Sequence, residues 1–156
     1  MLITRHETVA EAAQDDRIVH AAVRAFFKLA AVWQLDELEQ RQLLDDLGRS
    51  TLYGWRRSPP ARVSPDLMRR LSYVLGIHAL LRQLFPDTPV SQMALRLRRP
   101  HPVWFTGGRS LLAFMLDGGP VAMHQVRSYL VSETGSEVGA PPSDASAWAG
   151  AVPRFI

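Results

Sequence analysis

The chain has 156 residues, of which 47% are apolar and 21% charged, so it is long enough to bury a core and is not a disordered chain. It contains no cysteine, which excludes a disulfide scaffold, a thiolate zinc site and a cysteine nucleophile. No apolar run approaches the roughly 18 residues that cross a bilayer, and the amino terminus is acidic where a secretory signal is basic. We therefore expect a cytoplasmic protein with no membrane partner.

The net charge of +3 hides a segregation along the chain. Residues 1–46 carry five Lys or Arg against nine Asp or Glu, residues 47–110 carry eleven against two, and residues 111–156 carry two against four. Nearly all of the basic residues are arginine, whose planar guanidinium suits phosphate and guanine. The central block therefore indicates either a surface for a polyanion or acidic partner, or a solvated face without a partner.

Apolar residues recur at helical spacing and nowhere alternate as in a strand, so the sequence predicts an all-α fold. A first long helix is expected over 16–33, with a core-facing stripe made of Ile18, Val19, Ala22, Val23, Phe26, Phe27, Ala30 and Trp33. A second helix is expected over 36–46, with a buried side made of Leu38, Leu43, Leu44 and Leu47. Asp36 caps it, and a short third helix over 50–57 follows the break at Gly48.

The remaining elements are also punctuated by caps and breakers. Ser64 and Pro65 begin a helix that Gly76 ends, a further helix spans 77–85, and the proline-rich stretch 86–89 marks a soft domain boundary. Next come a short helix over 90–97, a loop over 98–108, a helix over 111–117 capped by Ser110, a Gly-Gly break, and a last helix over 121–132. We predict an amino-terminal domain over 1–86, a second helical domain over 87–132 and a flexible tail over 133–156.

The sequence contains no motif for catalysis, for a cofactor or for a metal. It has no phosphate-binding glycine loop, no His-Glu-x-x-His pair and no serine elbow, and its five histidines lie far apart. We therefore expect a protein that is not an enzyme and that holds no cofactor. His101, in the loop rich in proline and glycine, is expected to be an exposed loop histidine.

The helices over 36–46 and 50–57 match a helix-turn-helix unit, whose second helix fits a major groove about 12 Å wide. If Leu52 and Trp55 face the core, the candidate DNA-contacting residues lie on or beside the outward face: Arg49, Ser50, Thr51, Tyr53, Arg56 and Arg57. The alternative is that the last two arginines form an ordinary charged helix end, favourable to the macrodipole. Asp45 and Asp46 lie in the turn, where they would repel phosphate.

Two stretches carry a resemblance to a known family. The segment 31–57 (AVWQLDELEQRQLLDDLGRSTLYGWRR) is similar to the Xre-like helix-turn-helix of the Xre/MbcA/ParS antitoxin family, whose members pair with RES-domain toxins. The segment 99–110 (RPHPVWFTGGRS), followed by Leu112, Met115, Leu116, Gly118-Gly119 and Val126-x-x-Tyr-Leu, resembles the family's toxin-binding domain. The family commonly has Asn-Pro where this chain has His101-Pro102, and often a proline and an acid where it has Leu111 and Ala113.

The resemblance implies an antitoxin that binds a RES-type, NAD-depleting toxin, neutralises it by occlusion and represses its own operon. Trp104, Phe105 and Arg109 are then candidate toxin contacts, since aromatic residues and arginine dominate protein interfaces. The two aromatic residues have an alternative role in packing the second domain, and the arginine has one as a structural hydrogen-bond donor. The long first helix is a candidate dimer surface, because helix-turn-helix proteins usually read paired half-sites.

The tail carries four further candidate toxin contacts, namely Trp148, Arg154, Phe155 and Ile156. A segment that folds on binding would present an aromatic ring and a carboxylate to a nucleotide-binding cleft. Two other interpretations of the whole chain stay open at this point. One is a transcriptional regulator without a toxin, and the other is a toxin-binding protein that has lost DNA binding.

Overall fold

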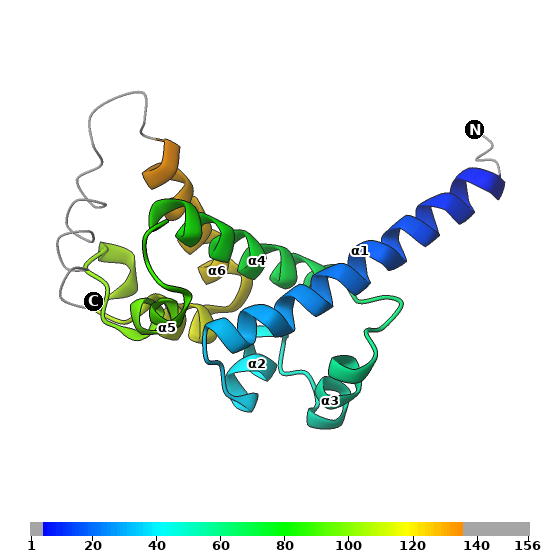
Figure 1. Cartoon of the computed structure of the whole chain (residues 1–156), viewed down its shortest axis with the longest axis horizontal. Helices are drawn as coiled ribbons and strands as arrows, with labels where there is room; N and C mark the ends of the chain where they lie inside the picture. Colours follow the sequence, from blue (N-terminus) through cyan, green and yellow to red (C-terminus); the bar gives the residue numbers. More distant parts are fainter. Residues whose placement is uncertain (1–4, 136–156) are drawn as a thin grey trace.

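The computed structural model describes the backbone of residues 5–135 and the side chains of residues 16–134. Within this range the protein is all-helical, as the sequence predicts, and its one β-bridge joins Pro100 to Ser110. The elements are α1 (Arg5–Val32), α2 (Glu37–Leu43), α3 (Arg49–Arg57), α4 (Pro65–Leu84), α5 (Val90–Arg98), the 3-10 turn η1 (Trp104–Thr106) and α6 (Leu111–Gly135). Figure 1 shows α4 lying along α6, with α2 and α3 together on one side of α1.

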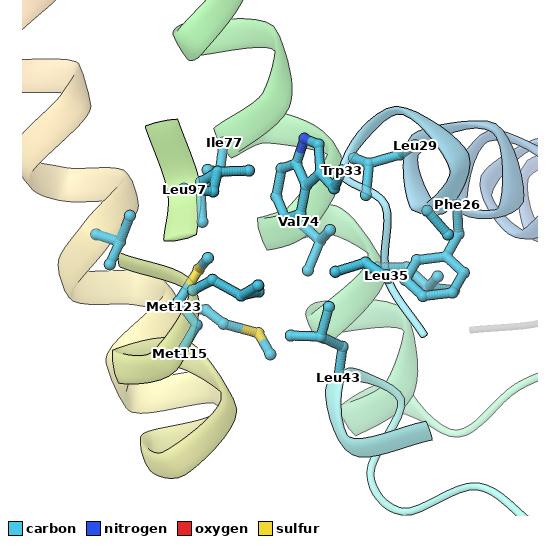
Figure 2. Close-up of a cluster of buried hydrophobic side chains, with 14 of the residues drawn as sticks. Phe26, Leu29, Trp33, Leu35, Leu43, Val74, Ile77, Leu97, Met115 and Met123 are labelled. Atoms are coloured by element: carbon cyan, nitrogen blue, oxygen red, sulfur yellow. The ribbon is translucent and has the colours of Figure 1, made fainter. Parts of the chain in front are cut away.

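A single hydrophobic cluster joins the helices (Figure 2). Trp33, at the carboxyl end of α1, is fully buried and its indole nitrogen donates to Nδ1 of His78 on α4 at 3.0 Å. Burial, and secondarily the charge of Arg82, lowers the pKa of His78, so the ring stays a neutral acceptor. Met115 and Met123 of α6 reach the same cluster as Leu43 of α2 (Figure 2). Residues from both sides of the expected boundary at 86/87 therefore share one core.

Three expectations about helix ends are wrong. The first helix begins at Arg5 and not at residue 16. Gly76 does not end a helix, because α4 continues without a break to Leu84. A β-carbon at that glycine would lie 3.4 Å from Nε of Arg127, an ordinary contact, so the glycine lies inside α4 on the side that packs against α6. The second helix ends at Leu43 and not at residue 46, because Asp45 and Asp46 adopt left-handed φ values of 62° and 54°.

Two expectations about burial are also wrong. Leu38, placed on the buried side of the second helix, is 58% exposed. The buried side of α2 is formed by Gln40 and Leu43, and Leu38 lies about 200° around the axis from Gln40. Ile18, placed in the stripe of the first helix, is 45% exposed.

The expected break in the last helix is present. Gly119 adopts φ 64° and ψ −145°, and Pro120 follows it inside α6. Ser110 accepts a hydrogen bond from the backbone nitrogen of Ala113 at 3.0 Å, as expected of its cap. The kink therefore divides α6 at the place where the glycine and proline signals predict two helices.

Candidate functional site

The helices α2 and α3 form the expected helix-turn-helix pair. Asp36 and Glu39 make a reciprocal capping box, in which Asp36 accepts from the Glu39 backbone nitrogen at 2.7 Å and Glu39 accepts from that of Asp36 at 3.0 Å. The turn is held by Arg41, whose Nε donates to the Leu47 carbonyl at 2.8 Å. Leu52 of α3 is fully buried and packs α3 against the core. These contacts orient α3 with its polar face outward.

The structure brings all six candidate DNA-contacting residues together on α3, and all six are exposed. They are Arg49, Ser50, Thr51, Tyr53, Arg56 and Arg57. Arg49 and Tyr53 are linked through an acid of α2. Arg49 pairs with Glu37 at 3.0 Å, and the Tyr53 hydroxyl donates to the same carboxylate at 3.1 Å. Glu37 therefore offsets part of the positive charge that this face would present to phosphate.

Arg56 lies where α3 meets α1 and α2. Its Nη2 donates to Gln40 Oε1 at 3.0 Å, and its guanidinium lies 5.3 Å from the ring centroid of Phe27 and 5.6 Å from that of Tyr53. These contacts orient the guanidinium while the residue stays exposed. Arg56 therefore connects the exposed face of α3 to the surface of α1.

The two acids of the turn lie beside the kink of α6. Asp45 pairs with Nη2 of Arg70 at 3.3 Å, and Nε of that arginine also reaches Asp66 at 3.3 Å. Both turn acids, with Arg70 and Asp117, line a recess of about 310 Å³ that extends to Pro120. The repulsion expected from Asp45 is therefore partly offset by a cation on α4.

A rigid loop precedes α6 and carries Trp104, whose side chain is 82% exposed. Thr106 is fully buried, and its hydroxyl lies within hydrogen-bonding distance of the carbonyls of His101, at 3.1 Å, and Val103, at 3.0 Å. Gly107 has a φ of 62°, in the left-handed region that glycine reaches without strain. The loop therefore holds a large aromatic side chain in water on a fixed backbone.

Phe105 and Trp104 have different surroundings although they are adjacent. Phe105 is partly buried and lies edge-on to Tyr129, with ring centroids 5.7 Å apart, and tilted against Phe114 at 5.3 Å. Trp104 contacts the Phe105 ring edge-on at 5.8 Å and otherwise projects outward. Phe105 thus packs the second half, as one of its two interpretations predicts, and serves as the platform for Trp104.

The expectation that His101 is an exposed loop residue is wrong, because it is only 2% exposed. Its Nδ1 accepts a hydrogen bond from the Val103 backbone nitrogen at 3.1 Å, and its ring lies edge-on to that of Tyr129 at 5.6 Å. Burial lowers the pKa of His101 to about 4. The residue is therefore a neutral part of the core at pH 7 and fixes the loop from inside.

Arg109 makes the structural contacts that one of its two interpretations predicts. Its Nη1 pairs with Asp117 at 2.5 Å, its Nε donates to the Thr106 carbonyl at 3.3 Å, and its guanidinium lies 5.7 Å from the centroid of Phe114. The side chain is nevertheless 47% exposed, so part of it faces solvent beside the Trp104 loop.

The tail candidates Trp148, Arg154, Phe155 and Ile156 lie outside the described residues.

Sequence reasoning missed Arg98, which joins the two halves of the chain. Its guanidinium pairs with both carboxylate oxygens of Glu39 at 2.7 and 2.8 Å and donates to the Gln34 carbonyl at 2.7 Å. The hydrogen bond from Arg98 lowers the pKa of Glu39 below its ordinary value. The sequence signal, one arginine among many in a basic block, does not distinguish it from its neighbours. Arg98 ties α5 to the capping box that begins the helix-turn-helix.

The described part of the chain contains no group of three or more His, Asp or Glu side chains placed to hold a metal ion. Over the same residues, no helix combines the length and the apolarity that a bilayer crossing requires. The arrangement instead offers two surfaces, a basic helix face and an exposed tryptophan on a rigid loop.

Comparison with known proteins places the chain in a family. It is 36% identical over 121 residues to the uncharacterized protein y4oB of Sinorhizobium fredii (strain NBRC 101917 / NGR234), and the match covers 78% of this chain and 90% of that protein. The chain belongs to the y4oB family. Since 121 residues exceed the 86 of the expected first domain, the kinship includes residues on both sides of the expected boundary. Neither a protein-family model nor a solved structure matches the chain.

Proposed function

We propose that this member of the y4oB family is an antitoxin that binds a RES-type, NAD-depleting toxin and neutralises it by steric occlusion. This role follows the resemblance to the Xre/MbcA/ParS family and requires neither a catalytic residue nor a cofactor in this chain. The protein acts in the cytoplasm, where the toxin would deplete NAD. It also represses its own operon through α3, as a homodimer that reads paired half-sites.

The observation that carries the proposal is the exposed Trp104 on its rigid loop. A tryptophan left 82% exposed is a large apolar area that a free protein gains nothing by presenting. The buried Thr106 and His101 hold the loop, so binding costs little conformational entropy. Aromatic anchors of this kind dominate protein interfaces, and Arg109 beside it supplies a charged rim.

The test is co-expression with the product of the neighbouring gene, followed by affinity capture, sizing of the complex and a growth assay. Trp104→Ala is expected to weaken the complex at least about 30-fold, the effect of losing an interface anchor, and to abolish growth rescue. Val121→Ala is the matched control, because Val121 is also apolar and is 78% exposed. A harmless neighbour that does not bind, or a Trp104→Ala variant that rescues growth as well as the parent, refutes the proposal.

The tail contact is tested by deleting residues 145–156. If this segment enters the toxin cleft, the shortened chain still binds through Trp104 but no longer rescues growth. Full neutralisation by the shortened chain excludes Trp148, Arg154, Phe155 and Ile156 as contacts. This outcome leaves the Trp104 contact intact.

The second candidate function is a helix-turn-helix regulator without a toxin partner, and the exposed basic face of α3 favours it. A duplex from the region upstream of the gene, titrated at several salt concentrations, distinguishes the candidates. Phosphate contacts produce a steep fall of affinity with salt. DNA binding without toxin binding supports the regulator, and toxin binding without DNA binding supports an antitoxin that no longer represses its operon.

A further inference from the structure

A stripe of basic residues follows the exposed side of α1. It consists of Arg17, Ala21, Arg24, Lys28 and Ala31, and every one of these residues is exposed. Their spacing of four, three, four and three residues keeps them on one side of a helix. At about 100° per residue, the three basic side chains fall within about 40° of one another around the helix axis.

The stripe has one sign of charge. No acidic residue occurs between Arg17 and Leu35, and the acids that make residues 1–46 negative overall lie before and after this stretch. The opposite side of α1 is fixed in the core by Val23 and Phe26, which are 1% and 0% exposed. The basic side chains therefore share one face, and packing holds that face toward solvent.

The helix α3 contacts α1 at the residue next to Lys28. Arg56 lies 5.6 Å from the ring of Tyr53 on its own helix and 5.3 Å from the ring of Phe27 on α1. Arg24 lies about one turn before Phe27, and Lys28 is the next residue after it. Figure 1 shows α3 beside the carboxyl half of α1. Arg56 of α3 therefore lies close to the part of α1 that carries Arg24 and Lys28.

We propose that this stripe binds the phosphate backbone of DNA beside the groove that α3 enters. The inference rests on the proposed DNA binding and extends it to a second element. From Arg17 to Lys28 the stripe is about 16 Å long, at a rise of about 1.5 Å per residue. Phosphates along one strand recur every 3.4 Å of the helix axis, so this length faces several of them. The small side chains of Ala21 and Ala31 leave room for a backbone to approach the helix.

The experiment uses the full chain, a labelled duplex from the region upstream of its gene, and anisotropy titrations at several salt concentrations. The double variant Arg24→Gln with Lys28→Gln is expected to lower the slope of log affinity against log salt concentration by about 2, one for each lost phosphate contact. At 100 mM salt the affinity is expected to fall at least about tenfold. Circular dichroism checks that the helices remain, since both residues are exposed.

The matched control removes the same charge elsewhere, through Arg82→Gln with Arg127→Gln in α4 and α6, both exposed. This control is expected to keep the slope of the parent. If the control lowers the slope as much as the α1 variant, the effect is general electrostatics and the stripe is not a site. If the α1 variant keeps the DNA slope but weakens the toxin complex, the stripe is a protein interface and the inference is wrong.

A third variant separates this inference from the proposed function. Arg56→Gln with Arg57→Gln reports the contact of α3 itself. Loss of binding in this variant, with an unchanged slope in the α1 variant, overturns the stripe and leaves the DNA-binding function standing. A parent protein that binds no duplex at any salt concentration overturns both.

Discussion

The helix α3 and the loop around Trp104 are held in opposite ways. In α3 a single residue, Leu52, is fully buried, and the amino end of the helix at Gly48 has no side-chain cap. On its outer side, Arg49 forms an ion pair with Glu37 and Tyr53 donates a hydrogen bond to the same carboxylate. The loop is held by buried polar groups of Thr106 and His101 under an aromatic platform. If α3 binds DNA as proposed, it can adjust after contact, whereas a single anchor such as Trp104 gains most affinity from being fixed before binding.

The largest expected effect is the loss of the single apolar anchor of α3. Leu52→Ala is expected to destabilise the protein by about 3 kcal/mol, the usual cost of emptying a fully buried leucine site. DNA binding should be lost while the Trp104 loop keeps its contacts. Urea unfolding measures the free energy of unfolding, and capture of the proposed toxin partner measures whether the Trp104 loop is intact.

Leu38→Ala is the matched control for this variant, because it makes the same change on the neighbouring helix at a residue that is 58% exposed. We expect its effect to stay below about 0.5 kcal/mol, as for ordinary surface substitutions. Equal losses for the two leucines would mean that α3 is not docked through Leu52.

The loop around Trp104 is expected to respond to acid, because it contains the buried His101. The folded pKa of His101 is about 4, below its ordinary value of 6.5, so protonation favours the unfolded chain. The contribution of the neutral His101 to the free energy of unfolding is fully present above about pH 6.5 and is lost as the pH falls toward 4. At pH 5 the loss should reach about 2 kcal/mol, at 1.36 kcal/mol per pKa unit.

His101→Asn is the variant that isolates this effect. Its side-chain oxygen replaces Nδ1 as acceptor for the Val103 backbone nitrogen, and the resembled family commonly has asparagine before this proline. The difference in unfolding free energy between pH 7 and pH 5 should then shrink by about 2 kcal/mol. An unchanged pH dependence would show that another group titrates.

The glycines of the two regions provide an opposite pair of predictions. A β-carbon at Gly54 of α3 would meet nothing within 4 Å, so Gly54→Ala should stabilise the helix by about 0.5–1 kcal/mol. Gly107 has a φ of 62°, so Gly107→Ala should destabilise the loop by about 1–2 kcal/mol. Thermal unfolding of both variants checks the two signs, and a gain at Gly107 would contradict the left-handed turn.

The sequence predicts the elements well wherever the signal is local. Ser64, Ser110 and the capping acid Asp36 begin helices in the structure as they do in the sequence. The sequence pattern fails where packing decides, since Gly76 has the pattern of a helix end but lies inside α4, which packs against α6. The prediction that His101 is exposed is wrong for the same reason, because nothing in a loop rich in proline and glycine indicates that Tyr129 will cover the ring.

The candidate sites divide along the same line. The outward face of α3 follows from helical spacing alone, and all six residues named there are exposed together. The role of Glu37, which binds both Arg49 and Tyr53, depends on how α2 crosses α3 and is not visible in the sequence. The same holds for Arg98, whose partners Gln34 and Glu39 lie about sixty residues earlier.

The smallest expected effect on stability comes from the ion pair on α3. Glu37→Gln frees Arg49 and Tyr53 from a carboxylate while leaving the core unchanged, and exposed ion pairs contribute little to stability. One additional arginine then becomes available to phosphate, so the salt slope of DNA binding should steepen by about 1. Asp87→Asn, which removes the same charge from an exposed turn after α4, should leave the slope unchanged. If the two variants steepen the slope equally, net charge and not the outer face of α3 governs DNA binding.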